Sequence, residues 1–347
     1  MISFRQPGTV LTDRVFGVPL DHTRGDGEQI EVFAREVVAV DKADADLPWL
    51  LFLQGGPGFG AQRPAGRHCH LPVLRPARHP GGVHHRRLPG LTVTADDVYR
   101  HTYRTVLAKN AAHYERYPGD VAKAQRVASY LAAHDVRRPD GAPLSVEAFQ
   151  SIGAMLGQSS GSDALHYLLE SPFADDDELS DAFRYAMMDE LTFAAAPLYA
   201  LLHEPSYAQG FATRWAAQRI RAEFAEFDPG PAIEGAAPLL FTGEMTYPWM
   251  IDADPALRPL REAADILAER DDWPPLYDPA RLAGNDVPVA AAVWPQDSDG
   301  LRSEAGSFRR RSAARRRGAR PCAGYRRLPR PPRAGTGWRR RAGGRWR

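Results

Sequence analysis

Three runs of apolar residues along this chain have the pattern of β-strands. Residues 30–38 alternate between apolar and polar side chains and are rich in β-branched residues, which predicts a strand. Residues 49–53 form a continuous apolar run that ends in a glycine-rich turn at 54–58, and this predicts a buried strand followed by a tight turn. Residues 287–294 are again almost entirely apolar and predict a further buried strand.

Between these runs, from residue 94 to about residue 227, the spacing of apolar residues is helical. Apolar side chains recur every three or four positions in six segments, 95–107, 121–133, 146–156, 165–169, 183–193 and 211–227. No strand-like run interrupts them, and Pro229-Gly230-Pro231 then predicts a boundary. A strand and turn, a helical segment and another strand are the layout of an α/β core into which a helical domain is inserted.

The charge of the chain is distributed unevenly, although its net charge at neutral pH is only +1. Residues 301–347 contain 17 arginines, no lysine and one acid, Glu304, so the preceding 300 residues carry a net charge of −15. A second basic stretch, 63–87, contains 6 arginines, 5 histidines and no acid. Neither stretch shows helical or strand periodicity.

Three explanations of the basic stretches stay open. A shifted reading frame in a GC-rich gene would produce such sequence, because misread codons there yield Arg, Pro, Gly and Ala. A nucleic-acid-binding arm is the second, since dense arginines neutralise phosphates, but a tail rich in Pro and Gly also has the composition of a disordered segment. A metal site at His68, Cys69 and His70 is the third, and its spacing matches no zinc template. We favour the shifted frame and expect neither a metal nor a nucleic-acid partner.

The expected location follows from two patterns. The first residues lack the apolar core of a signal peptide, and no apolar run approaches the roughly 20 residues of a membrane span. The two cysteines, Cys69 and Cys322, both lie in the basic stretches. We therefore expect a cytoplasmic protein without a membrane partner.

The strand at 49–53 with its turn, Gln54-Gly55-Gly56-Pro57-Gly58, resembles the oxyanion-hole segment of proline iminopeptidases, which are α/β-hydrolases. Three segments resemble the cap domain of that family, namely 165–170 (LHYLLE), 202–207 (LHEPSY) and 243–249 (GEMTYPW). The resemblance implies an α/β fold, an α/β-hydrolase-like core with an incomplete sheet and an inserted all-helical cap domain. It also implies a serine aminopeptidase that releases N-terminal proline from peptides, with no cofactor and with a free peptide N-terminus as partner.

The resemblance divides the chain into five parts. They are an N-terminal part of the hydrolase core at 1–62, an anomalous basic insert at 63–87, a helical cap at 88–235, a C-terminal part of the core at 236–300 and an Arg-rich disordered tail at 301–347.

The catalytic groups that the resemblance implies are only partly present. Gly55, Gly56 and Pro57 correspond to the oxyanion-hole turn, and Asp297 stands where the ancestral triad acid would follow its strand. The string Gly157-Gln158-Ser159-Ser160-Gly161 offers Ser159 as a nucleophile, but the residues before it predict a helix, whereas a nucleophile elbow follows a strand.

The last of the 11 histidines is His203, whereas the triad order of α/β-hydrolases places the histidine after the acid. A serine hydroxyl without a neighbouring imidazole is a weak nucleophile. We therefore expect a chain of this family without activity, and a non-catalytic remnant that binds peptides or polyanions is the alternative.

Two acids resemble the cap residues that hold the ammonium group of the substrate, first Glu204 and then Glu244. A carboxylate in a partly dry pocket binds an ammonium group strongly. The alternative for Glu204 is a solvated carboxylate at a helix end.

Overall fold

The computed structural model describes residues 2–21, 24–45, 82–86, 93–175, 177–275, 277–284 and 289–293. The strand predicted at 49–53, the oxyanion-type turn of Gly55, Gly56 and Pro57, the acid Asp297 and the tail at 301–347 lie outside the described residues.

An antiparallel sheet of three strands, called the N-terminal sheet below, begins the chain. Its strands are β1 (Ile2–Gln6), β2 (Thr9–Pro19) and β3 (Gln29–Ala39), in that order across the sheet, and the short 3-10 helix η1 (Val40–Lys42) follows. The β1–β2 turn contains Gly8 at a φ of 84°, a left-handed backbone that favours glycine. The position of β3 confirms the strand predicted at 30–38.

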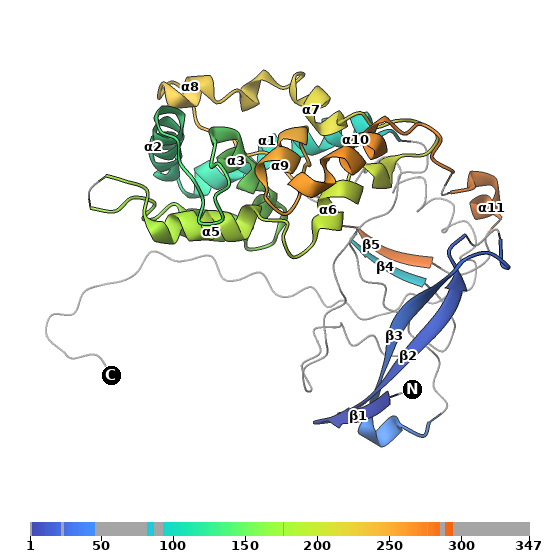
Figure 1. Ribbon diagram of the computed structural model, residues 1–347. Helices are drawn as coiled ribbons and strands as arrows, with labels where there is room; N and C mark the ends of the chain where they lie inside the picture. The colour runs from blue at the N-terminus through green and yellow to red at the C-terminus, as the bar shows by residue number, and fades with distance from the viewer. Residues whose placement is uncertain are drawn as a thin grey trace, which may run out of the picture.

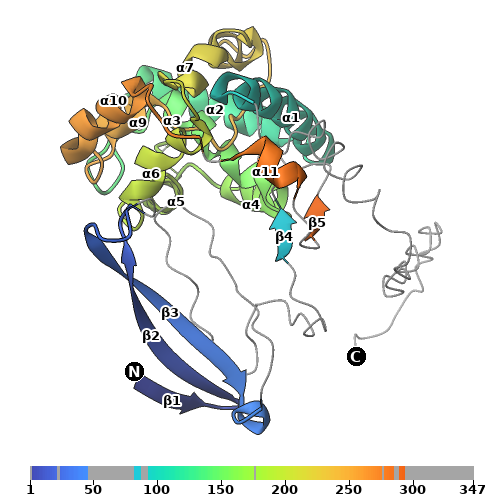
Figure 2. The ribbon, with the colours of Figure 1, turned by 90° about the vertical axis from the view of Figure 1, so that its right-hand side faces the viewer.

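Large apolar side chains lie exposed on the N-terminal sheet. They are Ile2, Phe4, Val15, Phe16, Ile30, Val32, Phe33 and Val37. Sheets of α/β proteins normally cover such side chains with helices. No described helix packs extensively on this sheet, and the two ribbon views show its strands extending away from the helices (Figures 1 and 2).

A second, two-stranded sheet joins residues that lie about 200 positions apart in the sequence. Its strands β4 (Gly82–Arg86) and β5 (Val289–Val293) are parallel. Strand β5 confirms the strand predicted at 287–294. Strand β4 lies within the basic stretch 63–87, which has no strand periodicity, because pairing with β5, rather than side-chain alternation, forms that strand. Parallel neighbours need a long crossover connection, and the helices lie in that connection.

The helical block (residues 93–275) lies between β4 and β5 in the sequence. Its longer helices are α1 (Ala95–Arg116), α2 (Asp120–Ala133), α4 (Gly161–Leu168), α5 (Asp181–Leu191) and α10 (Arg261–Glu269). Its shorter helices are α3 (Val146–Ser151), η2 (Ile152–Gly157), α6 (Pro197–Leu202), η3 (Pro205–Tyr207), α7 (Ala216–Arg221), η4 (Ala225–Phe227), α8 (Gly230–Ile233), α9 (Pro248–Ala253) and η5 (Arg258–Leu260). One further short helix, α11 (Pro279–Ala283), follows the block.

Local sequence signals start several of these helices. Thr94 caps α1, since its hydroxyl accepts the Asp97 backbone N–H at 3.3 Å while the Asp97 carboxylate accepts the Thr94 N–H at 3.1 Å. Ser145 and Ser180 cap α3 and α5 in the simpler one-way form. These caps explain why the helical periodicity of the sequence matches the observed helices closely at their N-termini.

Apolar packing holds the helical block together and continues beyond Pro229-Gly230-Pro231. One core cluster includes Phe149, Leu165 and Phe241, and a second includes Tyr103 and Tyr247. The packing of the helices reaches α10 through a third cluster.

The extended segment 236–247 belongs to the block because buried side chains satisfy its backbone. Asn110 donates to the Phe241 carbonyl at 2.8 Å and accepts the Phe241 N–H at 2.9 Å, and Gln150 donates to the Leu240 carbonyl at 2.8 Å. Buried backbone groups need such partners. Among the described residues, no helix is long and apolar enough to cross a membrane.

Candidate functional site

Glu204 follows α6 and is buried, with 3% of its surface exposed. Its two carboxylate oxygens accept the backbone N–H groups of Ala216 at 2.7 Å and Ala217 at 3.2 Å, both in the first turn of α7. Burial raises the pKa of Glu204, and these two backbone donors oppose that rise. The first N–H groups of a helix have no partner within it, so Glu204 supplies the acceptors that the start of α7 needs.

The backbone just before α7 has an unfavourable conformation that the hydrogen bonds from α7 to Glu204 help to stabilise. Arg214 and Trp215 both have left-handed φ angles, 51° and 55°, which are unfavourable for residues with a Cβ atom. The Arg214 N–H donates to the Ala268 carbonyl at 2.9 Å, which ties this turn to α10. Glu204 and α10 together hold a turn that the local sequence would not adopt alone.

Glu244 lies in the segment that leads to α9 and is half-buried. The Tyr199 hydroxyl on α6 donates a hydrogen bond to the Glu244 carboxylate. The Tyr199 ring in turn packs edge-on against His203, with 5.2 Å between ring centroids. Gly243 lets the segment approach α1, because a Cβ atom there would lie 2.7 Å from the Val106 side chain.

Both acids that the sequence predicts as amine ligands therefore lie close to helix α6. Tyr199 contacts Glu244, and Glu204 follows the last turn of the same helix. The two acids differ in their hydrogen bonds, since both carboxylate oxygens of Glu204 accept backbone N–H groups of α7. Glu244 instead accepts a hydrogen bond from the Tyr199 hydroxyl.

Ser159 lies exposed in the turn between η2 and α4. The turn is closed by backbone bonds from Gln158 N to the Met155 carbonyl and from Gly161 N to the Gln158 carbonyl. A Cβ atom at Gly161 would lie 1.6 Å from the Met155 carbonyl oxygen. The glycine of this GxSxG string thus serves close backbone packing, and a 3-10 helix, not a strand, precedes Ser159.

A buried contact between a serine, a histidine and an aspartate occurs elsewhere in the block. Ser162 Oγ lies 2.9 Å from His113 Nδ1, and His113 Nε2 lies 3.4 Å from the Asp120 carboxylate. Asp120 also bonds His166 Nδ1 at 2.9 Å. No motif in the sequence predicts this cluster, and its one sequence signal is the position of His113 on the buried face of α1, three residues after Asn110.

The three residue types match a catalytic triad, but their burial does not. The side chains of His113 and Asp120 are 0% and 1% exposed, whereas a catalytic imidazole must reach the reacting atoms. Burial lowers the pKa of His113, and the nearby Asp120 opposes that change. We interpret the cluster as the joint between α1, α2 and α4.

The described residues contain no group of three or more His, Cys, Asp or Glu side chains arranged to hold a metal ion. The triplet of His68, Cys69 and His70 lies outside them.

Two relatives show what this chain is similar to. It is 37% identical over 365 residues to the proline iminopeptidase of Aeromonas sobria, with 81% of this chain and 84% of that protein covered. It is 26% identical over 377 residues to the proline iminopeptidase aneH of Aspergillus aculeatus, with 81% and 82% covered. No protein-family model matches the chain.

These relatives place the chain among the α/β-hydrolases, in agreement with a helical block connecting two parallel strands. The chain belongs to the proline iminopeptidase family.

The alignment with the Aeromonas sobria protein is longer than this chain. It runs over 365 positions, whereas 81% of 347 residues is about 281 residues. About 84 aligned positions therefore have no residue in this chain.

Proposed function

We propose that this chain keeps the peptide-recognition part of a proline iminopeptidase and does not hydrolyse peptides. The observation that carries this proposal is the position of its GxSxG string. An elbow places its serine between a strand and a helix, and Ser159 instead lies between a 3-10 helix and α4.

The place where the family's nucleophile belongs supports the same proposal. The sequence between Gly58 and Thr94 contains no serine, and the alignment leaves about 84 positions without a residue in this chain, from 365 aligned positions and about 281 aligned residues. A loss of core strands together with the nucleophile accounts for both. On this account the helical block is the inserted cap, the sheet of the core is incomplete, and the protein acts in the cytoplasm.

Loss of activity is tested with a prolyl-arylamide substrate and the full chain. We expect no turnover above background, measured beside the Aeromonas sobria relative as a positive control. Robust turnover that disappears in Ser159→Ala would overturn the proposal, because it would make the Gly157–Gly161 turn a working elbow.

For peptide recognition, we propose that the ammonium group of the ligand binds the Glu244 carboxylate. Its half-buried carboxylate and the hydrogen bond from Tyr199 support this role. Glu204, which the sequence favours first, then contributes indirectly by holding α7. The partner is a peptide with a free N-terminus.

Calorimetric titration with a Pro-Ala peptide tests this site. We expect binding that is lost when the peptide's N-terminus is acetylated, and about tenfold weaker binding in Glu244→Gln, since an ion pair becomes a neutral contact. The matched control is Glu262→Gln, which changes an exposed carboxylate on α10. Equal binding of the free and acetylated peptides would contradict the proposal.

A further inference from the structure

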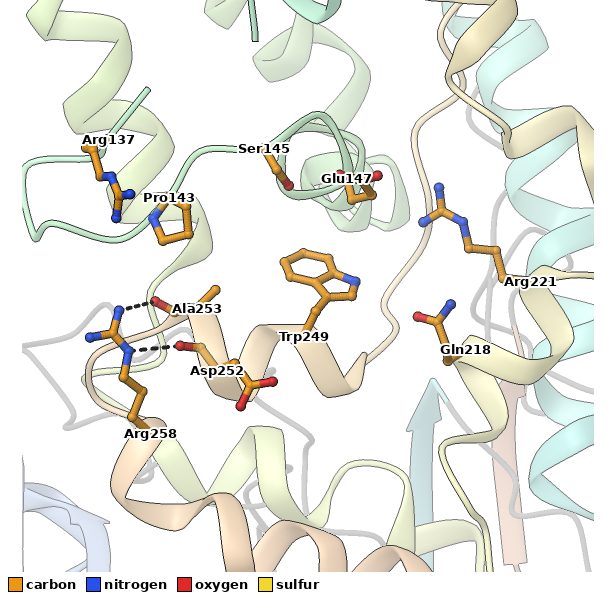
Figure 3. A pocket seen from close by; sticks show the side chains of 10 residues that line it. All are labelled: Arg137, Pro143, Ser145, Glu147, Gln218, Arg221, Trp249, Asp252, Ala253 and Arg258. Atoms are coloured by element: carbon orange, nitrogen blue, oxygen red, sulfur yellow. Dashed lines mark hydrogen bonds between the residues drawn. The ribbon is translucent and has the colours of Figure 1, made fainter. Parts of the chain in front are cut away.

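A cavity of about 730 Å³ opens in the helical block where the loop before α3, α3 itself, α7, α9 and η5 meet. This volume lies within the range of small-molecule sites, about 300–1,000 Å³. None of the predicted site residues lines it. Figure 3 shows the indole of Trp249 between two sets of arginines, with Arg137 and Arg258 on one side and Arg221 on the other.

The Trp249 indole is a firmly held wall of the cavity. It stacks on the Tyr247 ring with 5.8 Å between centroids and an interplanar angle of 14°. Tyr247 is fully buried, and Trp249 packs against two of the three core clusters of the block. A fixed aromatic face of this kind is suited to an apolar or planar ligand group.

Two of the arginines carry charges that no described carboxylate neutralises. Arg258 donates to the carbonyls of Asp252 at 2.8 Å and Ala253 at 3.2 Å, the two bonds drawn in Figure 3. Arg221 donates to the Gln150 side-chain oxygen at 2.7 Å and to the Phe227 carbonyl at 3.2 Å. All these acceptors are neutral, and each guanidinium has five N–H donors.

The acids of the cavity wall leave this positive charge in place. The Asp252 carboxylate pairs with Arg261 at 2.6 Å, and Arg261, which does not line the cavity, also pairs with Asp265 at 2.9 Å. Arg137 pairs with the exposed Asp135 at 3.1 Å. The lining thus carries three arginines, Arg137, Arg221 and Arg258, against two carboxylates, Glu147 and Asp252, so the cavity is positive.

We infer that this cavity binds an oxyanion attached to an apolar body, and specifically the C-terminal residue of a peptide. Its carboxylate would pair with Arg258 or Arg221, and its side chain would lie on Trp249. Guanidinium groups bind carboxylates through paired hydrogen bonds. The inference deepens the proposed peptide recognition, but it concerns the other end of the ligand and does not need the amine site.

The test uses the full chain and N-acetyl-Ala-Phe, whose blocked amine removes any contribution from Glu244. We expect this acid to bind in a calorimetric titration and its C-terminal amide to bind at least about tenfold more weakly, because the charge-assisted bond is lost. Phenyl phosphate is the third ligand. Binding of the phosphate without the carboxylate, equal binding of acid and amide, or binding of neither would overturn the inference.

A set of variants assigns the binding to the cavity. Arg258→Gln should weaken binding of the acid by about tenfold, and Arg258→Lys should weaken it less, since the charge remains without the planar fork. Arg126→Gln is the matched control, because it removes the same charge from an exposed residue paired with Asp177 outside the cavity. An equal loss in Arg126→Gln and Arg258→Gln would contradict the assignment. Unchanged near-UV circular dichroism of Arg258→Gln shows that the fold is intact.

Discussion

The helical block and the N-terminal sheet differ most in what covers their apolar side chains. In the block, Phe149, Phe241, Tyr103 and Tyr247 have no exposed surface, and they belong to continuous clusters. In the sheet, Leu11 is the one buried large apolar side chain of the described strands. Burial of a large apolar side chain stabilises a fold by about 1.5–3 kcal/mol, so the block has a source of stability that the sheet lacks.

The sheet is held instead by its backbone ladder and by two half-buried ion pairs. Arg14 pairs with Glu36 and Arg35 with Asp13, each at 2.6 Å. Independent stability of a sheet needs three or more strands with an apolar face, or packing against a helix. The comparison teaches that the helices of the block cover one another's apolar side chains, whereas the strands of the N-terminal sheet leave most of theirs exposed.

The largest predicted effect is on the free energy of unfolding, and it compares one Phe→Ala substitution in each region. Phe241→Ala should destabilise the helical block by about 3–5 kcal/mol, because it leaves a cavity beside Phe149. Phe33→Ala, in the exposed side chain of β3, should change the same transition by less than about 0.5 kcal/mol. Thermal unfolding followed by far-UV circular dichroism measures both. Equal shifts would break the comparison.

A smaller effect is expected for the anchor of α7. Glu204→Ala leaves the N–H groups of Ala216 and Ala217 without their acceptor in a buried place, at a cost of about 1–3 kcal/mol. Glu262→Ala, an exposed carboxylate on α10, is the control and should change little. Urea unfolding of the two variants gives the difference. If Glu204→Ala is as stable as Glu262→Ala, the carboxylate does not support α7.

The smallest effect concerns pH and the joint between α1, α2 and α4. The unfolded imidazole of His113 has an ordinary pKa of about 6.5, and burial lowers this pKa in the fold. The unfolded state therefore takes up the proton first, so the stability contribution of His113 is present above about pH 6.5 and is lost as the pH falls below it.

The variant His113→Gln should be less stable than the unchanged chain at about pH 7.5. Between about pH 7.5 and pH 5.5, its free energy of unfolding should fall less than that of the unchanged chain. Thermal unfolding at both pH values measures the two slopes. Parallel slopes would show that another group sets the pH dependence of the block.

The sequence predicted those parts of the molecule whose signals are local. Alternation at 30–38 gave β3, and helical spacing at 121–133 gave α2 almost to the residue. Strand β4 could not be found this way, because Gly82–Arg86 has no alternation and pairs with residues about 200 positions away. The predicted helix at 211–227 is shorter in the structure, since the left-handed Arg214 and Trp215 precede α7.

The candidate site was predictable in its residue types but not in its contacts. The motifs around Glu204 and Glu244 pointed to both acids. The use of Glu204 by a helix that begins 12 residues later depends on the tertiary fold, and so does the bond between Tyr199 and Glu244. His113, Asp120 and His166 lie on three different helices, so no local sequence pattern predicts their contacts.

Hydrogen exchange of the full chain, read by mass spectrometry, tests the central claim most directly. The claim is that the helical block is a packed unit, whereas the N-terminal sheet, whose large apolar side chains are mostly exposed, is not. Amides in buried helices exchange only through opening of the whole unit, and amides in poorly covered elements exchange through local opening. We predict slow, common exchange in α1, α2 and segment 236–247, and exchange at least about 100-fold faster in β2 and β3. Equal protection of β2, β3 and the helices would contradict the account, because it would show one cooperative core that includes the sheet.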